Sequence, residues 1–91
     1  MKTMPDAQRP LRTSRTAVRE SEDGVIVQRT DTPVEVALNP TAYALWELCD
    51  GDTTVAEMVA AVCDLFAVTR EQAERDVAEG INQMRATGLI R

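Results

Sequence analysis

The spacing of apolar residues changes at Asn39–Pro40, and this change constrains the fold more than any other feature of the chain. Just before it, the apolar side chains at positions 34, 36 and 38 alternate with others, which is typical of a strand with one apolar face. After it, apolar residues recur at helical spacing, at Ala42, Leu45, Trp46 and Cys49. Asn39 suits an N-cap and Pro40 the first helical position, where the missing N–H carries no penalty. We therefore expect strands before this boundary and helices after it.

The part before the boundary favours a small antiparallel meander, because Thr, Val and Ile accumulate between turn-forming residues. Strands are expected at residues 13–19, 25–29 and 34–38. Gly24 suits the end of a hairpin turn over residues 21–24, since glycine adopts positive φ without a steric penalty. A second turn at residues 30–33 ends with Pro33, which fits the start of an edge strand.

Three helices are expected after the boundary, each with a start or stop signal. Thr54–Glu57 matches a capping box, in which a hydroxyl accepts the N–H three residues on and a carboxylate reaches back to the cap. Thr69–Gln72 repeats this pattern. The first helix is expected to end at Asp50–Gly51, and the third at Gly88 in a left-handed conformation. The buried stripes of the second and third helices are predicted at Val55, Met58, Val59, Val62 and Phe66, and at Ala73, Val77, Ile81 and Met84.

These elements together predict an α+β fold of the winged helix-turn-helix type, a three-stranded antiparallel sheet followed by three helices. The length of 91 residues leaves room for one domain, which we place at residues 11–91, with Leu89 and Ile90 folded back onto the core. Residues 1–10 hold two prolines, mixed charges and no apolar periodicity, so a disordered lead-in is expected there.

Composition excludes several classes of function. The chain has no histidine, which removes the usual general base and the commonest metal ligand. Its net charge of −5 repels phosphate backbones, so no nucleic-acid partner is expected. No apolar run approaches the roughly 20 residues that cross a bilayer, and no signal peptide is visible. We therefore expect no membrane partner and a cytoplasmic location.

The two cysteines offer little chemistry. Cys49 and Cys63 are interpreted as buried thiols on apolar helical faces. Neither has the neighbouring base or cationic cluster that a nucleophilic thiol needs, and their spacing does not fit a zinc site. The four glycines are scattered, so no phosphate-binding loop is expected. The sequence thus predicts no catalytic residue, no metal and no cofactor, and a protein that is not an enzyme.

An interaction surface remains, and two features indicate its place. The strand at 34–38 would lie at the sheet edge, where an extended peptide can add to unpaired main-chain groups. Gly80 interrupts the third helix, which indicates either a close approach by a partner or tight packing on the protein's own sheet. A DNA-reading helix fits less well, because the third helix carries the acidic residues Glu71, Glu74, Asp76 and Glu79.

The segment Leu38-Asn39-Pro40-Thr41-Ala42, followed by Leu45-Trp46-Glu47-Leu48 and Asp50-Gly51, resembles the signature of the PqqD-like family. Its members are also called recognition elements of ribosomally synthesised and post-translationally modified peptides (RiPPs). The stretches Thr54-Val55 through Phe66 and Asp76-Val77 to Gly88-Leu89-Ile90 extend the resemblance, which covers residues 16–91. It implies a wing of three strands before a three-helix bundle. It also implies a domain that binds the leader of a precursor peptide and presents its core to modifying enzymes, without performing chemistry itself.

The resemblance also implies where the leader docks, as an additional antiparallel strand on the third strand, in the cleft beside the third helix. Backbone bonds would come from Val34, Glu35 and Val36. The binding residues carried onto the strand are Pro33, Val34, Glu35, Val36, Ala37 and Leu38. Those carried onto the third helix are Asp76, Val77, Gly80, Ile81 and Met84, with Glu74 and Arg85 as charged contacts. Val77 and Ile81 also belong to the expected core stripe.

This sequence departs from the family pattern at one place, and that departure indicates the type of precursor. The quinone branch often has Tyr-Pro-Glu before the Leu-Asn element, whereas Thr32-Pro33-Val34-Glu35 stands here. This favours a lasso-peptide precursor, with a leader peptidase or cyclase as the partner enzyme. The alternatives are a PQQ-type peptide chaperone for a radical SAM enzyme and a winged-helix DNA-binding regulator, and the oligomeric state stays open. The acidic third helix predicts that leaders with Lys or Arg near the docked segment associate faster, and that salt reduces this gain.

Overall fold

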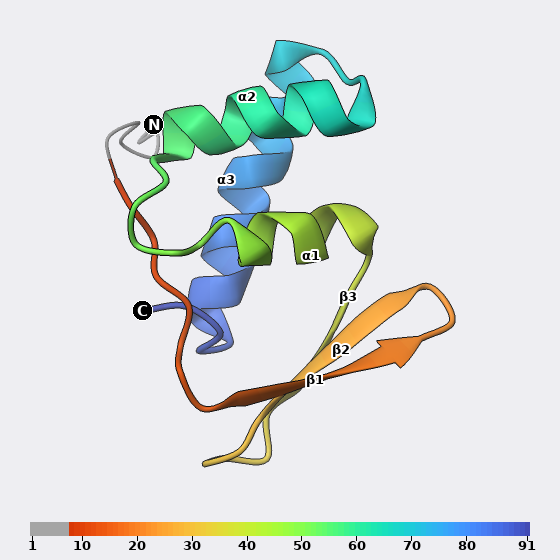
Figure 1. The fold of residues 1–91 in the computed structure, drawn as a ribbon, viewed down its shortest axis with the longest axis vertical. Coiled ribbons are helices and arrows are strands. Elements are labelled where there is room, and N and C mark those ends of the chain that lie inside the picture. Colours follow the sequence, from red (N-terminus) through yellow and green to blue (C-terminus); the bar gives the residue numbers. More distant parts are fainter. Residues whose placement is uncertain (1–7) are drawn as a thin grey trace.

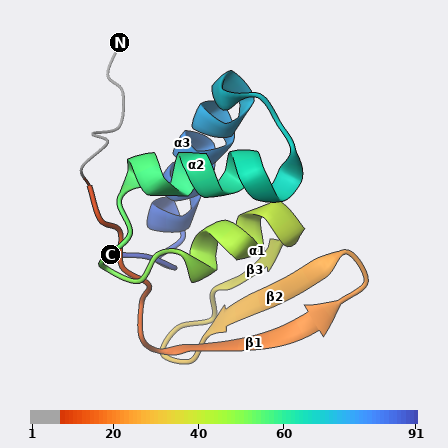
Figure 2. The ribbon, with the colours of Figure 1, turned by 45° about the horizontal axis from the view of Figure 1, so that its top comes forward.

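The structure is a computed structural model that describes residues 8–91, and it contains the predicted strands followed by the predicted helices. The elements are β1 (Thr16–Ser21), β2 (Gly24–Arg29), β3 (Glu35–Leu38), α1 (Pro40–Glu47), α2 (Val55–Phe66) and α3 (Arg70–Ala86). The sheet lies at one end of the molecule with α1 nearest to it, and α3 crosses both other helices (Figures 1 and 2). The predicted α+β architecture is thus confirmed.

The sheet is antiparallel, with the strand order β1-β2-β3. Ser21 pairs with Gly24, so Glu22 and Asp23 form the predicted hairpin turn. Gly24 has a φ of +154°, and a Cβ atom at this position would overlap the carbonyl oxygen of Leu38. Only glycine therefore allows β2 to begin this close to the end of β3.

The helices α1 and α2 begin at the predicted caps. The side chain of Asn39 accepts a hydrogen bond of 2.8 Å from the backbone N–H three residues on. The capping box of α2 is complete, since Thr54 accepts from the N–H of Glu57 at 3.1 Å and donates its own N–H to that carboxylate at 2.8 Å. However, α1 ends at Glu47 rather than at Asp50–Gly51, because the carboxylate of Asp50 instead binds N–H groups of the loop that follows.

The third helix keeps one half of its predicted capping box. Thr69 accepts from the N–H of Gln72 at 3.1 Å, but the side chain of Gln72 donates to Asp76 at 2.8 Å instead of returning to the cap. At the other end Gly88 has a φ of +81°, as predicted. The N–H of the residue after Gly88 donates to the carbonyl oxygen of Met84 at 2.8 Å, which closes a Schellman motif.

The core lies between the inner face of the sheet and the three helices. It includes Leu89 and Ile90, which fold back as predicted. The buried apolar residues are Val27, Val36, Leu38, Leu45, Trp46, Cys49, Val55, Met58, Val59, Val62, Ala73, Val77, Ile81, Met84, Leu89 and Ile90. Phe66, expected in the buried stripe of α2, is half-buried and packs against the rim of this core.

Residues 8–13 form a strap that connects the α1–α2 loop with the C-terminal residues (Figure 1). The carbonyl oxygens of Gln8 and Pro10 each accept a backbone hydrogen bond of 2.9 Å from the segment 51–55. Thr13 donates its N–H to the carbonyl oxygen of Leu89 at 2.9 Å. The expected disorder of residues 1–10 thus does not extend to residues 8–10, and residues 1–7 lie outside the described part of the chain.

The strap also explains why the first strand begins later than predicted. Thr13 is predicted to begin this strand, but its hydroxyl donates to the carbonyl oxygen of Gly88 at 2.6 Å and its N–H donates to the carbonyl oxygen of Leu89. The strand begins at Thr16 instead.

The domain is expected to lose stability in acid because of two carboxylates, one in the loop before α2 and one in its capping box. Hydrogen bonds from backbone N–H groups hold the pKa of Asp50 and the pKa of Glu57 below their ordinary values of 3.8 and 4.5. Each carboxylate therefore stabilises the fold above its ordinary pKa, and this contribution disappears as the pH falls through the lowered value. We expect the free energy of unfolding, measured by urea titration, to fall as the pH drops below about 4.5. The variant D50N/E57Q should show a shallower fall, and an equally steep one would contradict the assignment.

None of the described helices is both long enough and apolar enough to span a membrane.

Candidate functional site

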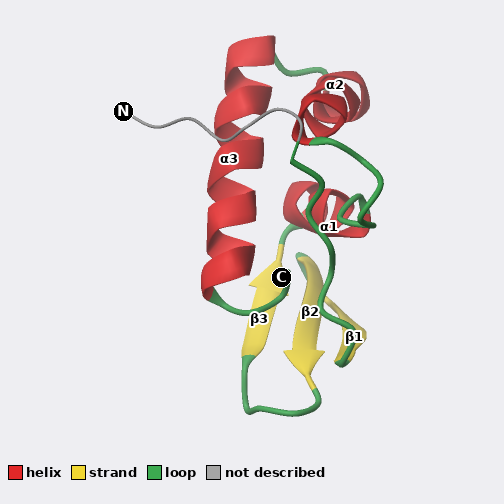
Figure 3. Cartoon of the chain, turned by 90° about the vertical axis from the view of Figure 1, so that its left-hand side faces the viewer, coloured by secondary structure: helices red, strands yellow, loops and turns green. Residues whose placement is uncertain are grey.

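The strand β3 forms one edge of the sheet, on the side that faces α3, while β1 forms the far edge (Figure 3). The Cα atoms of β3 all lie more than 8 Å from those of α3, so the backbone of the helix does not close this edge. Among residues 8–91, no other strand pairs with β3 on this side. The predicted open edge is therefore present in the structure.

The register of the sheet decides which main-chain groups of β3 point outward. The N–H of Arg29 donates to the carbonyl oxygen of Val34 at 2.9 Å. Because hydrogen-bonded pairs alternate along an antiparallel ladder, positions 36 and 38 likewise direct their N–H and C=O groups toward β2. Glu35 and Ala37 then direct theirs away from the sheet. The open edge thus offers two complete donor–acceptor pairs, two residues apart.

This result changes the set of residues predicted to supply backbone bonds. Of Val34, Glu35 and Val36, only Glu35 has outward groups, and Ala37 supplies the second pair. Pro33 lies in the bend before β3 and has no N–H to donate. The side chains of Val36 and Leu38 are buried on the inner face of the sheet, where they hold the strand to the core.

The helix α3 carries two neighbouring stripes of residues, and the predicted site residues on this helix are divided between them. One stripe faces a pocket and consists of Asp76, Glu79, Gly80 and Gln83. The other stripe is the core stripe, to which the predicted site residues Ile81 and Met84 belong. They are 0% and 2% exposed and do not line the pocket, whereas Val77 belongs to both surfaces.

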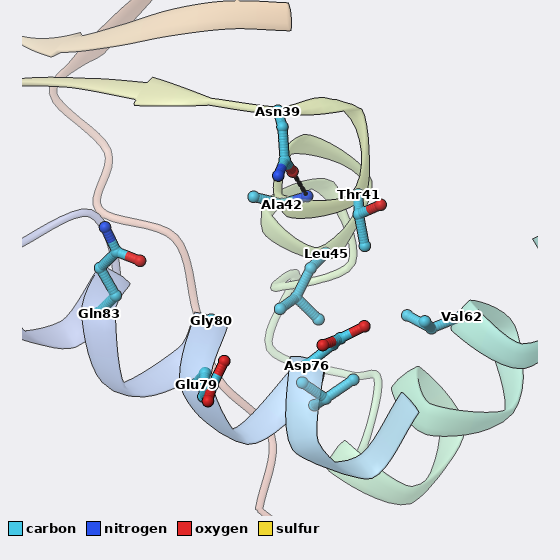
Figure 4. A pocket seen from close by; sticks show the side chains of 10 residues that line it. Asn39, Thr41, Ala42, Leu45, Val62, Asp76, Glu79, Gly80 and Gln83 are labelled. Atoms are coloured by element: carbon cyan, nitrogen blue, oxygen red, sulfur yellow. Dashed lines mark hydrogen bonds between the residues drawn. The ribbon is translucent and has the colours of Figure 1, made fainter. Parts of the chain in front are cut away.

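The pocket lies between the N-terminal half of α1 and the middle of α3, next to the end of β3, and has a volume of about 240 Å³. Figure 4 shows Leu45 pointing from α1 toward α3, with the carboxylate of Asp76 next to it and that of Glu79 near Gly80. The lining residues are Asn39, Thr41, Ala42, Leu45, Val62, Asp76, Val77, Glu79, Gly80 and Gln83. The volume is below that of most drug-binding cavities and suits one side chain rather than a cofactor.

Seven of the lining residues were not predicted. Those on α3, Glu79 and Gln83, could have been found, because they lie three and seven residues after Asp76 and therefore on its face. The others carry no such signal in the sequence, since their helical spacing also fits a core face. They are Asn39, Thr41, Ala42, Leu45 and Val62.

Position 80 needs a glycine because another helix of the protein packs closely against it. A Cβ atom at Gly80 would lie 2.5 Å from Cδ2 of Leu45, so the missing side chain lets α1 pack onto α3. The predicted alternatives were contact with a partner or packing on the sheet, and the observed neighbour is a helix instead. Because Gly80 also lines the pocket, it places the floor of the pocket deeper than any other residue would.

The charged residues of α3 differ in their surroundings. One oxygen of Asp76 accepts a hydrogen bond from Gln72 at 2.8 Å, and Glu79 is in no ion pair within residues 8–91. Glu74, a predicted charged contact, faces solvent and forms an exposed ion pair with Arg70 at 3.4 Å. Arg85, the second predicted contact, is exposed and outside the pocket. The negative charge of the pocket therefore comes from Asp76 and Glu79.

Neither cysteine lines this pocket. Burial raises the pKa of the Cys49 thiol to about 12, so it stays protonated at neutral pH. Cys63 is half-buried, which differs from the predicted pair of buried thiols. Among residues 8–91, no three side chains of the His, Cys, Asp and Glu types come together as a metal site would require.

Comparison with solved structures identifies two with the same fold. A structure described as lasso peptide synthetase B1 complexed with the leader peptide has a TM-score of 0.77 and 18% sequence identity, over 92% of this chain and 99% of that chain. A structure of TbiB1 in complex with the TbiA(beta) leader peptide has a TM-score of 0.75 and 20% identity, over 89% of this chain and 94% of that chain. At these identities the similarity shows the fold.

Comparison with curated proteins finds no match. The family described as coenzyme PQQ synthesis protein D (PqqD) matches residues 24–90, which begin with β2 and include β3 and all three helices. This match extends over well more than half of the sequence and includes the open strand edge and the pocket. The chain belongs to the PqqD family.

Proposed function

We propose that this protein is a non-catalytic adaptor that binds the leader of a ribosomally made precursor peptide. The leader would bind by strand addition to β3. The observation that carries the proposal is the open edge of β3, where Glu35 and Ala37 direct their N–H and C=O groups toward the side of α3. Main-chain bonds at such an edge bind extended peptides with little demand on their sequence.

The comparisons support a leader peptide as the ligand and a lasso-peptide pathway as its source. Both structures with the same fold contain a leader peptide, and one of them is described as a lasso peptide synthetase. In such a pathway the adaptor would deliver the bound precursor to a leader peptidase or cyclase. The acidic exposed face of α3 argues against the DNA-binding alternative, because it repels phosphate groups.

The geometry specifies how the leader would lie. An antiparallel leader strand would exchange both main-chain bonds with Glu35 and both with Ala37, giving four bonds. Leader residues opposite these two would point to solvent, because paired side chains share a face. Leader residues opposite Val36 and Leu38 would point toward the helices, where side-chain pockets can read the sequence.

A proline at Ala37 tests strand addition. Ala37→Pro removes one outward N–H and leaves the ladder to β2 in place, because Ala37 does not bond to β2. Peptides selected from a display library of random twelve-residue sequences on the wild-type protein serve as probes, and their affinities are measured by fluorescence anisotropy. We expect Ala37→Pro to weaken binding about tenfold or more, since a main-chain bond is lost and the ring obstructs the edge.

The matched control is Val18→Pro, which places proline at an outward position of the far edge, on β1. This variant should bind the selected peptides like the wild type. Circular dichroism must show that both variants are folded. Equal binding by Ala37→Pro and wild type would refute strand addition at β3, and an equal loss in both variants would place the effect in the sheet as a whole.

A further inference from the structure

The position of the pocket relative to β3 decides which leader residue meets it. The pocket borders Asn39, the residue that directly follows β3. Leu38 faces the core, so a leader residue paired with Leu38 would face the helices as well. This argument rests on the proposed strand addition. It singles out one leader position, the residue just before the one that bonds to Ala37.

The floor of the pocket is apolar and narrow. Ala42 and Leu45 contribute from α1, and Val77 and Gly80 contribute from α3. Leu45 and Val77 are 2% and 1% exposed, so little of each is left for a ligand to cover. A slim, unbranched aliphatic chain fits such a floor better than a bulky ring, since the volume is only about 240 Å³.

The rim of the pocket is acidic. Asp76 and Glu79 lie one helical turn apart on α3, and Figure 4 shows both carboxylates beside the apolar floor. The hydrogen bond from Gln72 uses one oxygen of Asp76, and Glu79 has no ion-pair partner within residues 8–91. No Lys or Arg is among the lining residues. The pocket therefore combines an apolar floor with two carboxylates whose charge nothing in the lining neutralises.

We infer that this pocket receives a Lys or Arg side chain of the docked leader. The aliphatic part of that side chain would cover the small exposed parts of Leu45 and Val77, and its cationic end would lie between the carboxylates of Asp76 and Glu79. A wholly apolar leader side chain would cover the same floor but would partly remove both carboxylates from water without replacing their hydration. An acidic side chain would be repelled. The pocket thus selects for positive charge at one leader position.

The test uses the same random twelve-residue display library on three forms of the full chain. The first is the wild type, the second D76N/E79Q, which neutralises the rim while keeping its shape, and the third E71Q/E74Q. The third neutralises two exposed acidic residues of α3 outside the pocket, so both double variants change the net charge from −5 by two units. Long-range attraction of basic peptides is therefore matched between the two variants.

We expect peptides selected on the wild type to be enriched in Lys or Arg at one position. Replacing that residue with norleucine should weaken anisotropy-measured binding to the wild type about fivefold, as for a partly exposed ion pair. The same replacement should change binding to D76N/E79Q by less than about twofold, while E71Q/E74Q should behave like the wild type.

Three results would contradict the inference, and they separate it from the proposed function. If selected peptides lose affinity in Ala37→Pro but show no preference for Lys or Arg, the pocket does not select positive charge and strand addition stands. If E71Q/E74Q abolishes the preference as fully as D76N/E79Q does, the preference is long-range and the pocket is not its source. If no selected peptide depends on Ala37, the proposed function fails and this inference fails with it.

Discussion

Replacing Trp46 with alanine is expected to lower the free energy of unfolding by about 3–5 kcal/mol, a large share of the stability of a domain of this size. Trp46 is 4% exposed, and its indole N–H donates to the carbonyl oxygen of Leu89 at 3.1 Å. The guanidinium of Arg12 lies 5.6 Å from its ring centroid. The side chain therefore joins α1, the strap and the C-terminal residues, and its removal leaves a cavity at their junction. Denaturant titration followed by circular dichroism measures the loss, because the variant has no tryptophan to report fluorescence.

The matched variant Trp46→Phe separates burial from hydrogen bonding. It keeps most of the apolar volume and removes the N–H, and the carbonyl oxygen of Leu89 still accepts from Thr13 at 2.9 Å. A loss of only about 1–2 kcal/mol is expected for this variant. If Trp46→Phe were as unstable as Trp46→Ala, the hydrogen bond rather than burial would dominate, and the present account of this junction would be wrong.

Gly24→Ala is expected to lower the free energy of unfolding by about 3–5 kcal/mol and to weaken peptide binding at the same time. Two penalties combine in this variant. The φ of +154° is strained for alanine, and its Cβ atom would overlap the carbonyl oxygen of Leu38, which is backbone and cannot turn aside. The beginning of β2 must then move away from the end of β3, where the pocket begins at Asn39. Urea unfolding and the anisotropy assay report the two effects.

Gly51→Ala is the control for Gly24→Ala. Gly51 also has a positive φ, of +84°, but an added Cβ atom would meet only the flexible side chain of Leu11, at 3.2 Å from Cδ1. We expect a loss of about 1–2 kcal/mol and no change in peptide affinity. Equal losses in the two variants would mean that positive φ alone, and not the overlap with Leu38, accounts for the role of Gly24.

The starts of the helices could be predicted because their signals act over only a few residues. Asn39–Pro40 and Thr54–Glu57 carry their own capping chemistry, and no distant residue competes for it. The end of α1 was placed too late because Asp50 turns to the following loop and the strap bonds to Gly51. The bond to Gly51 comes from Pro10, about 40 positions earlier in the chain, and helical spacing carries no trace of it.

The site was predictable in outline but not in detail. The position of β3 as the last strand, together with Pro33 at its start, indicated an open edge. Which groups point outward depends on the phase of pairing, which the bond between Arg29 and Val34 reveals in the structure. The wall of the pocket on α1 was missed because the spacing of Leu45 is that of a core residue, and it proved to be both.

The strap has a consequence for the order in which this protein acquires its fold. The hydroxyl of Thr13 donates to the carbonyl oxygen of Gly88, which lies 75 positions later in the chain. During translation the strap leaves the ribosome before its partners Gly88 and Leu89 are synthesised. Contacts so far apart in sequence also slow folding, because a long loop must close before they form. A nascent chain can therefore form its hairpin and first helices early, but the domain is complete only once α3 has left the exit tunnel.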